Sequence, residues 1–264
     1  MIYEPKAHKI VKIQKYTDEV WLFRVKTDIN PWPGQFFQVS VLGVGECPLA
    51  SCSYEKKYVD MLVRKAGNVT NAIFKLKAGD EVYLRGPYGH GYKVDEIKGK
   101  NLILVAGGTG VAPVTSLIDY IDKNRDLFGK ISIYFAFRDD EHVFLGDRIK
   151  KWGKKYDINL CLDKESKKLK AEIGHVPDIM VKKKQNTNNS VALLCGPEGM
   201  MNATSNKLNG LGLSNDRIYW NMERRMECGI GNCNRCLIHD VYVCSDGPVF
   251  RYDLIKEKIE HEAN

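Results

Sequence analysis

The sequence lacks the long hydrophobic run that a membrane-spanning helix requires. No stretch of its 264 residues approaches the roughly 18 consecutive apolar residues that would cross a bilayer. The N-terminal segment MIYEPKAHKIVKIQKY has no continuous apolar region followed by a small-residue cleavage site, so it does not predict a secretory signal. We therefore expect a cytoplasmic protein.

The sequence also lacks a concentrated block of charge of one sign. Its 40 Lys and Arg against 33 Asp and Glu give a net charge of +7 that is spread along the chain. The runs KKWGKK and KKKQNTNN are more typical of a solvated helix face and a surface loop than of a nucleic-acid surface, which would combine clustered cations with aromatic residues. Nucleic acid is therefore not an expected partner.

Cysteine, in contrast, is plentiful, with eight in the chain. In a reducing compartment such thiols more often serve as metal ligands, redox groups or core residues than as disulfides. Cys228, Cys233, Cys236 and Cys244 follow the spacing C-x4-C-x2-C-x7-C. The first three match the plant-type [2Fe–2S] spacing, whereas structural zinc sites more often use two C-x2-C pairs. The pattern favours iron–sulfur over zinc and predicts these four cysteines as the metal ligands.

The pattern of apolar and polar residues changes twice along the chain, which predicts three regions. Short alternating and β-branched runs separated by turn signals fill residues 1–97 and indicate a small barrel or sandwich. Residues 98–221 alternate buried-type strands with helical stretches near 111–123, 145–155, 175–184 and 198–209, the pattern of a parallel sheet in an α/β domain. Residues 222–264 carry the four cysteines and are too few for a large core, so we expect a metal to stabilise them.

Two turns of the second region are built to approach a phosphate. NLILVAGGTGVAP leads from a strand through Gly107, Gly108, Thr109 and Gly110 into a helix, whose N-terminal N–H groups attract anions. Pro113 stands where the dinucleotide fingerprint has its third glycine, so the motif is incomplete. LLCGPEGMM is again a strand that opens into a helix, with Cys195 at the carboxyl end, where such sheets bind ligands. Cys195 could face a nicotinamide or be a buried thiol.

The first region offers a second candidate anion site. Arg64 ends a strand and is followed by a turn into a predicted helix, made of Gly67, Asn68, Val69 and Thr70. An arginine, backbone N–H groups and a hydroxyl suit a phosphate, although an ordinary helix cap also explains Thr70.

The chain has a strand-rich N-terminal region, followed by VAGGTGVAP, LLCGPEGM, ERRMECGIGNCNRC and YVCSDGPVF. With these features it resembles the ferredoxin-NADP reductase superfamily over its whole length. The resemblance implies an N-terminal FAD-binding β-barrel, a parallel-sheet NAD(P)-binding domain and a small C-terminal [2Fe–2S] subdomain. It implies a flavin pyrophosphate site at Arg64 and Gly67–Thr70, and a nicotinamide-cofactor phosphate loop at Gly107–Pro113. Cys195, Gly196 and Pro197 would lie beside the nicotinamide, with Cys195 as the candidate catalytic residue.

The family's flavin motif Arg-x-Tyr-Ser is degraded here. It falls near CPLASCS, where either Ala50 or Ser51 takes the serine place and no arginine precedes it. The resemblance therefore leaves backbone contacts to FAD from Leu49, Ala50, Ser51 and Cys52. Arg138 would favour the 2′-phosphate of NADPH, whereas Asp139 would disfavour it. We expect NADH because the resembled subunits use it, with NADPH as the alternative.

Within the superfamily, the tail is similar to electron-transfer subunits of dihydroorotate dehydrogenase, sulfhydrogenase and anaerobic sulfite reductase. The ERRM lead-in and the short gap before Cys244 resemble the sulfite reductase and sulfhydrogenase members more than the dihydroorotate type, and the best single match is to the sulfite reductase members. This implies electron transfer from NADH through FAD and a [2Fe–2S] cluster to a sirohaem catalytic subunit and a ferredoxin-like iron–sulfur subunit. Three alternatives stay open: the other two enzyme systems, a zinc-stabilised interaction module on an inactive reductase fold, and a self-contained NAD(P)H oxidase or ferredoxin reductase.

Overall fold

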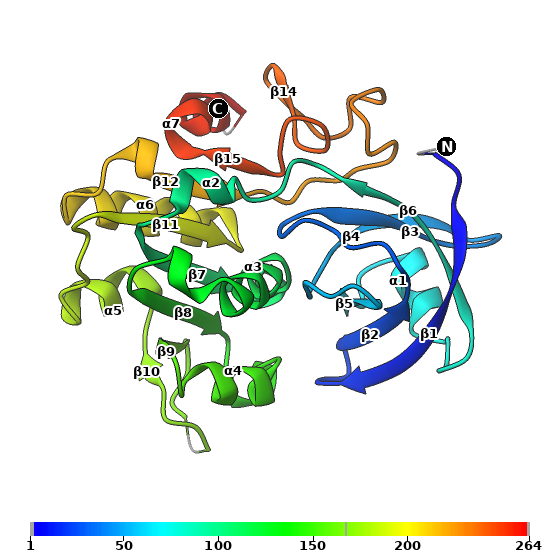
Figure 1. Cartoon of the computed structure of the whole chain (residues 1–264), viewed down its shortest axis with the longest axis horizontal. Coiled ribbons are helices and arrows are strands. Elements are labelled where there is room, and N and C mark those ends of the chain that lie inside the picture. The colour runs from blue at the N-terminus through cyan, green and yellow to red at the C-terminus, as the bar shows by residue number, and fades with distance from the viewer. Residues whose placement is uncertain (1–2, 167, 263–264) are drawn as a thin grey trace.

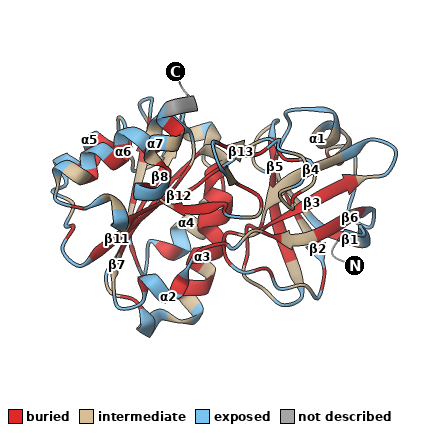
Figure 2. Cartoon of the chain, turned by 90° about the horizontal axis from the view of Figure 1, so that it is seen from above, coloured by how far each residue is buried: buried red, intermediate tan, exposed pale blue. Residues whose placement is uncertain are grey.

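A computed structural model describes residues 3–166 and 168–262. Figure 1 shows an N-terminal β-barrel beside an α/β unit, with the C-terminal tail lying across one side of both. Figure 2 shows that burial is concentrated in the strands of both units and in α3, which lies between them. The expected combination of an antiparallel barrel, a parallel sheet and a small C-terminal region is confirmed.

The barrel consists of six antiparallel strands in the order β4-β3-β6-β1-β2-β5. They are β1 (Lys6–Lys15), β2 (Val20–Lys26), β3 (Phe36–Val41), β4 (Gly45–Ala50), β5 (Tyr58–Arg64) and β6 (Glu81–Tyr88). A bridge between Ser51 and Met61 brings the end of β4 to β5 and closes the ring. Alternate residues such as Phe23, Val25, Val39 and Met61 face a shared interior core, as the period of two requires. Two short helices, α1 (Asn68–Ile73) and α2 (Val94–Ile97), flank β6 in the chain.

The second unit is a seven-stranded sheet in the order β10-β9-β8-β7-β11-β12-β15, parallel except at the β15 edge. Its strands are β7 (Asn101–Gly107), β8 (Ile131–Phe137), β9 (Asp157–Leu162), β10 (Glu172–Ile173), β11 (Ser190–Cys195), β12 (Ile218–Asn221) and β15 (Val249–Arg251). The helices that connect them are α3 (Val111–Lys123), α4 (Gly146–Trp152), α5 (Val176–Lys182) and α6 (Glu198–Gly210). These four helices lie close to the positions that the sequence predicts.

The two faces of this sheet bury separate cores. Leu102 and Leu104 of β7 pack with α3 and α4, whereas Ile103 and Val105 of the same strand pack with α5 and α6. A strand covered on both faces must be apolar at every position, which explains the unbroken run NLILVAG.

The tail is joined to the α/β unit more closely than its length suggests. β15 pairs antiparallel with β12, and α7 (Tyr252–Glu262) packs beside it. β13 (Leu237–Ile238) and β14 (Val241–Tyr242) form a small separate hairpin. Side chains of the tail, among them Ile238, Val243 and Phe250, belong to the same core as Ile103 and Val105. The tail therefore shares the core of the sheet instead of relying on its own few apolar residues, and its stabilisation by a metal stays a prediction.

None of the helices in the described residues combines the length and the apolar character needed to cross a bilayer. The eight cysteines, all of them within the described residues, are free thiols.

Candidate functional site

The first glycine turn joins β7 to α3 through a single 3-10 turn, Gly108–Gly110. Gly108 has φ +54°, a conformation that favours glycine. A Cβ on Gly110 would lie 2.6 Å from the carbonyl oxygen of Cys195, and one on Gly107 would lie 2.7 Å from the sulfur of Met200. The glycines therefore let the two predicted loops pack against each other, so that 107–110 and 195–197 form one surface.

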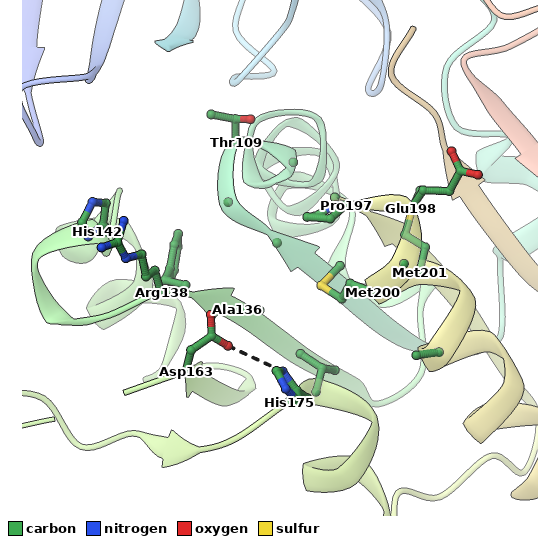
Figure 3. A pocket seen from close by; sticks show the side chains of 18 of the residues that line it. Thr109, Ala136, Arg138, His142, Asp163, His175, Pro197, Glu198, Met200 and Met201 are labelled. Carbon is green, nitrogen blue, oxygen red and sulfur yellow. Dashed lines mark ion pairs between the residues drawn. The ribbon is translucent and has the colours of Figure 1, made fainter. Parts of the chain in front are cut away.

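This surface is the wall of a cleft of about 1280 Å³ at the carboxyl ends of the parallel strands. Figure 3 shows Thr109 and Pro197 on its inner wall, with Arg138 and His142 at one end. His175 and Asp163 form an ion pair at its rim, with 3.6 Å between Nδ1 and Oδ1. The predicted residues Arg64, Gly107–Gly110, Arg138, Gly196 and Pro197 all line this cleft.

The Asp139 side chain contacts residues that are close to it in the chain. Its carboxylate accepts from His142 Nδ1 at 2.5 Å and from the Glu141 N–H at 3.2 Å. Contact with His142 lowers the pKa of Asp139. Arg138 projects into the cleft with its side chain 66% exposed.

A smaller hollow of about 220 Å³ adjoins the cleft. The barrel contributes Leu49, Ala50 and Arg64, α3 contributes Pro113, and the tail contributes Met226. The residues that line both cavities are Arg64, Thr109, Met222 and Glu223. Three regions of the chain therefore meet at one place, which was visible in the sequence only as separate motifs.

Other residues predicted to hold FAD lie outside this hollow. Ser51 and Cys52 are fully buried, and the Ser51 hydroxyl donates to the carbonyl oxygen of Ser53 at 2.7 Å. Burial raises the pKa of the Cys52 thiol to about 12. The Gly67–Thr70 turn begins α1, and the Thr70 hydroxyl accepts from the Ala66 and Gly67 N–H groups, both at 2.9 Å. Gly67 is the N-cap of α1, and Thr70, three residues later, closes a capping box on it, so Thr70 is not itself the ordinary N-cap that the sequence left open.

The Cys195 side chain is fully buried, and it lines neither cavity. Burial raises the pKa of its thiol far above the usual range. Its backbone carbonyl oxygen lies against Gly110, which lines the cleft. Its catalytic role stays a prediction.

The segment from Cys228 to Cys244, the cysteine loop, brings its thiols close enough to interact. Cys228 interacts with Cys233, and Cys244 interacts with both Cys236 and Cys228. Within residues 3–166 and 168–262, no three cysteine, histidine or carboxylate side chains gather closely enough to hold a metal ion. Ligation by these four thiols therefore stays a prediction.

Backbone N–H groups point at these sulfurs. Gly231 donates to Cys244 Sγ at 3.1 Å, and Ile230 and Asn232 donate to Cys228 Sγ at 3.4 and 3.3 Å. Burial opposes ionisation of Cys228, but these donors outweigh it and lower the pKa of its thiol to about 7. Donors of this kind stabilise thiolate ligands, so the loop fits the predicted iron–sulfur cluster.

Arg85 of β6 attaches the cysteine loop to the barrel. Its guanidinium donates to the carbonyl oxygens of Glu227 at 2.7 Å and Cys228 at 2.5 Å, and it pairs with the carboxylate of Glu46. The Arg85 side chain is only 8% exposed. The sequence analysis missed Arg85, because no local pattern links residues 143 positions apart.

Glu223 was also missed. It follows β12 at the carboxyl edge of the sheet, which is the signal that singled out Cys195 and could have found it. Glu223 lines the cleft and is surrounded by protein on its other sides. The resulting loss of hydration raises the pKa of its carboxyl group, and the nearby charge of Arg64 partly opposes this shift.

Two family models match the chain. The oxidoreductase NAD-binding domain matches residues 104–206, and the iron-sulfur cluster binding domain of dihydroorotate dehydrogenase B matches residues 223–256. The expected nicotinamide-cofactor and iron–sulfur assignments agree with these two domains.

Curated relatives match the chain over most of its length. The sulfhydrogenase 2 gamma subunit of Pyrococcus furiosus is 34% identical over 95% of this chain and 96% of its own length. A probable dihydroorotate dehydrogenase B (NAD(+)) electron transfer subunit of the same organism is 33% identical over 86% of this chain and 83% of its own. These names represent two of the three branches that the tail resembles.

Solved structures share the fold. An NADH-dependent reduced ferredoxin-NADP oxidoreductase aligns with TM-score 0.78 and 22% identity over 96% of this chain and 93% of its own. A ferredoxin NADP+ reductase from Neisseria gonorrhoeae, solved with bound FAD and NADP, aligns with TM-score 0.70 and 16% identity over 82% and 97%. Taken with the curated relatives, these likenesses show that the chain belongs to the family of iron–sulfur electron-transfer subunits, built on the ferredoxin-NADP reductase fold, that includes sulfhydrogenase gamma and dihydroorotate dehydrogenase B subunits.

Proposed function

We propose that this chain is an electron-input subunit that takes electrons from NADH and passes them through FAD and a [2Fe–2S] cluster to a partner enzyme. One observation carries the proposal. The nicotinamide cleft and the smaller hollow share four wall residues, and the hollow is also lined by Met226, two residues before the cluster ligand Cys228. Three cofactor sites in contact form a short path for electrons.

When bound, the flavin would accept a hydride from the nicotinamide, and the cluster would carry the electrons onward one at a time. The chain's own residues bind and align. Gly107–Gly110 and the start of α3 would hold the pyrophosphate of the nicotinamide cofactor, with Gly196 and Pro197 beside the nicotinamide. Leu49, Ala50 and Arg64 would line the flavin site.

The charges near Arg138 support NADH over NADPH. The carboxylates of Asp139, Asp140, Glu141 and Asp163 follow β8 and β9 at this end of the cleft, where the cations are Arg138 and Lys164. An excess of acid disfavours a 2′-phosphate, although Arg138 alone would accept one.

For the final acceptor we propose sulfite, reduced by a sirohaem subunit with a ferredoxin-like iron–sulfur subunit as the second partner. The ERRM lead-in and the seven-residue gap between Cys236 and Cys244 support a sulfite reductase or hydrogenase partner over dihydroorotate dehydrogenase, and the tail as a whole resembles the sulfite reductase members most. A second candidate is a hydrogenase partner, favoured by the 34% identity to sulfhydrogenase gamma over 95% of the chain. A cytoplasmic location for either complex is supported by the sequence pattern and by eight cysteines that form no disulfide in the described residues.

The test is a visible spectrum of the anaerobically purified chain before and after NADH, with flavin, iron and zinc assayed on the same sample. We expect flavin and iron–sulfur bands that both bleach with NADH. A Cys228→Ser variant should keep flavin bleaching and lose the cluster bands, which separates the two steps. A colourless protein that contains zinc and resists reconstitution with FAD, iron and sulfide would refute the proposal and favour a zinc-stabilised interaction module.

A further inference from the structure

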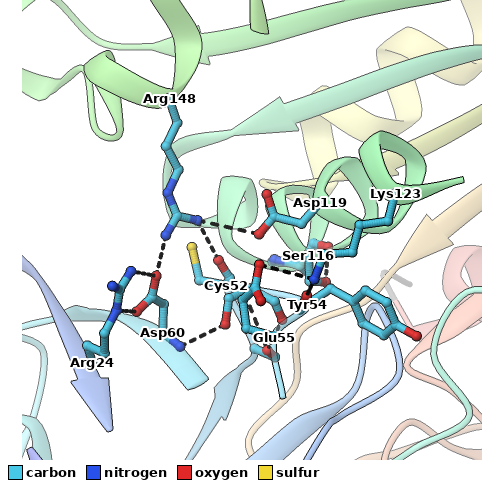
Figure 4. A network of polar contacts seen from close by, with 12 residues as sticks. Arg24, Cys52, Tyr54, Glu55, Asp60, Ser116, Asp119, Lys123 and Arg148 are labelled. Atoms are coloured by element: carbon cyan, nitrogen blue, oxygen red, sulfur yellow. Dashed lines mark hydrogen bonds and ion pairs between the residues drawn. The ribbon is translucent and has the colours of Figure 1, made fainter. Parts of the chain in front are cut away.

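A charged network joins the two large units behind the flavin hollow. Arg148 projects from α4, and its guanidinium reaches the barrel, where Nη1 donates to the carbonyl oxygen of Cys52 at 2.8 Å and Nη2 donates to the carboxylate of Asp60. Figure 4 shows the same guanidinium directed at Asp119 of α3, with 3.8 Å between Nη1 and Oδ2. One side chain therefore contacts β5, the segment after β4, and α3.

The arrangement exceeds what neutralising Asp60 requires. Asp60 is fully buried, and Arg24 of the barrel already holds its carboxylate with two hydrogen bonds of 2.7 and 2.9 Å. Arg24 alone would compensate the charge inside the barrel. Arg148 adds a second cation from the α/β unit, and Asp119 of the same unit balances its charge. The additional contact between Arg148 and Asp60 therefore joins the two units.

Asp60 transmits this contact to the segment that the sequence assigns to the flavin. The Cys52 N–H donates to the Asp60 carbonyl oxygen at 2.7 Å, and the Asp60 N–H donates to Ser53 Oγ at 2.9 Å. Cys52 is thus held on its N–H side by Asp60 and on its carbonyl side by Arg148. Leu49 and Ala50, which line the hollow, lie three and two residues before Cys52.

The helix that carries Arg148 directly follows a segment that lines the nicotinamide cleft. Arg138, His142 and Phe144 line the cleft, and α4 begins two residues after Phe144. Phe144 is buried and packs edge-on against Phe137 at 5.3 Å. The position of Arg148 is therefore fixed relative to the cleft.

We propose that Arg148 is a positioning residue that fixes the segment Leu49–Cys52, whose first two residues line the hollow, relative to the nicotinamide cleft. The inference rests on the proposed function, since it concerns the alignment of the two sites for electron transfer. A planar guanidinium suits this role because it can donate to a carbonyl and a carboxylate at once, which a lysine cannot do with the same geometry.

The experiment compares Arg148→Gln and Arg148→Lys with Lys150→Gln, a matched control that removes an exposed charge from the same helix. Hydrogen exchange of the amides in 51–53 is measured in the flavin-free protein, and the rate constant of flavin reduction is measured at saturating NADH. We expect faster exchange in R148Q than in the control. We also expect flavin reduction to slow by about tenfold or more with little change in the NADH dissociation constant, because misplacement by ~1 Å can cost up to ~100-fold. R148K should lie between the two.

The outcomes separate this inference from the proposed function. A wild type that binds FAD and oxidises NADH, with R148Q equal to K150Q in both exchange and reduction rate, would refute the positioning role alone. Faster exchange in R148Q with an unchanged reduction rate would also refute it, since Arg148 would then only stabilise the fold. A wild type that binds no FAD would remove the proposed function and this inference with it. If R148Q does not fold, the same comparisons with R148K decide.

Discussion

At Asp119, burial and neighbouring charges act on one carboxyl group in opposite directions. Burial raises its pKa to about 6, Arg148 and the Tyr54 N–H lower it, and Glu55 and Asp60 raise it further. A carboxyl whose folded-state pKa is raised takes up protons on folding. Its contribution to stability is therefore greatest at low pH and is lost as pH rises through the folded-state pKa.

We expect Asp119→Asn to reveal this contribution. Between pH 5 and pH 7, the free energy of unfolding of the wild type should fall by about 1 kcal/mol relative to the variant, because only the wild type releases this proton. Urea unfolding of both proteins at matched cofactor content across this range measures the difference. A wild type whose stability stays parallel to that of the variant would show that Asp119 titrates as in the unfolded chain.

At the scale of elements, β6 determines where the cysteine loop lies. The loop contains only the two-residue strands β13 and β14, but Arg85 holds its entry through two carbonyl oxygens. Gln38 of β3 adds a hydrogen bond of 3.2 Å to the Glu227 carbonyl oxygen. The barrel therefore fixes the start of the loop, and the β12–β15 pairing fixes its end.

Arg85→Gln should loosen the loop. The variant loses charge-assisted hydrogen bonds at a buried site, and we expect the free energy of unfolding to fall by about 1.5–3 kcal/mol. Iron content should fall while FAD content stays close to that of the wild type. Arg235→Gln is the matched control, since Arg235 also contacts Glu227, through an exposed pair at 2.9 Å that contributes little. Equal iron content in the two variants would contradict an anchoring role for Arg85.

At the scale of the whole molecule, the order of the regions gives the path a direction. The nicotinamide cleft, the hollow and the cysteine loop adjoin in that order, and the loop lies at the surface, with Asn232 and Asn234 exposed around it. Electrons that reach the loop therefore need an acceptor outside this chain, which is why we propose a partner enzyme.

The acceptor can be identified with the complex purified through this chain. We expect NADH-dependent reduction of sulfite by the complex, and no sulfite reduction by the isolated chain, because the path ends at the loop. Proton reduction without sulfite reduction would instead favour the hydrogenase candidate. Sulfite reduction at the full rate by the isolated chain would contradict the need for a partner. Rapid reduction of generic electron acceptors, without any stable complex, would favour a self-contained reductase.

Features with a local cause could be predicted. The apolar run at 102–106, the glycines at 107–110 and the helix at 111–123 follow one another in the chain, so periodicity and turn chemistry were enough to find them. The spacing of the four cysteines is local in the same way, so it could be recognised as a candidate cluster motif. β4 was missed because GECPLA contains a proline and no regular alternation, and it is a strand only because β3 pairs with it.

The sequence by itself determined the order of the three regions, the glycine turns and the spacing of the four cysteines, because each depends on residues that are neighbours in the chain. The tertiary structure alone decided that Cys195 and Ser51 turn away from the cavities, that Arg85 holds Cys228, and that Arg148 holds Cys52. Those contacts join residues up to 143 positions apart. They depend on which strands pair and which helices pack, and no local pattern carries that information.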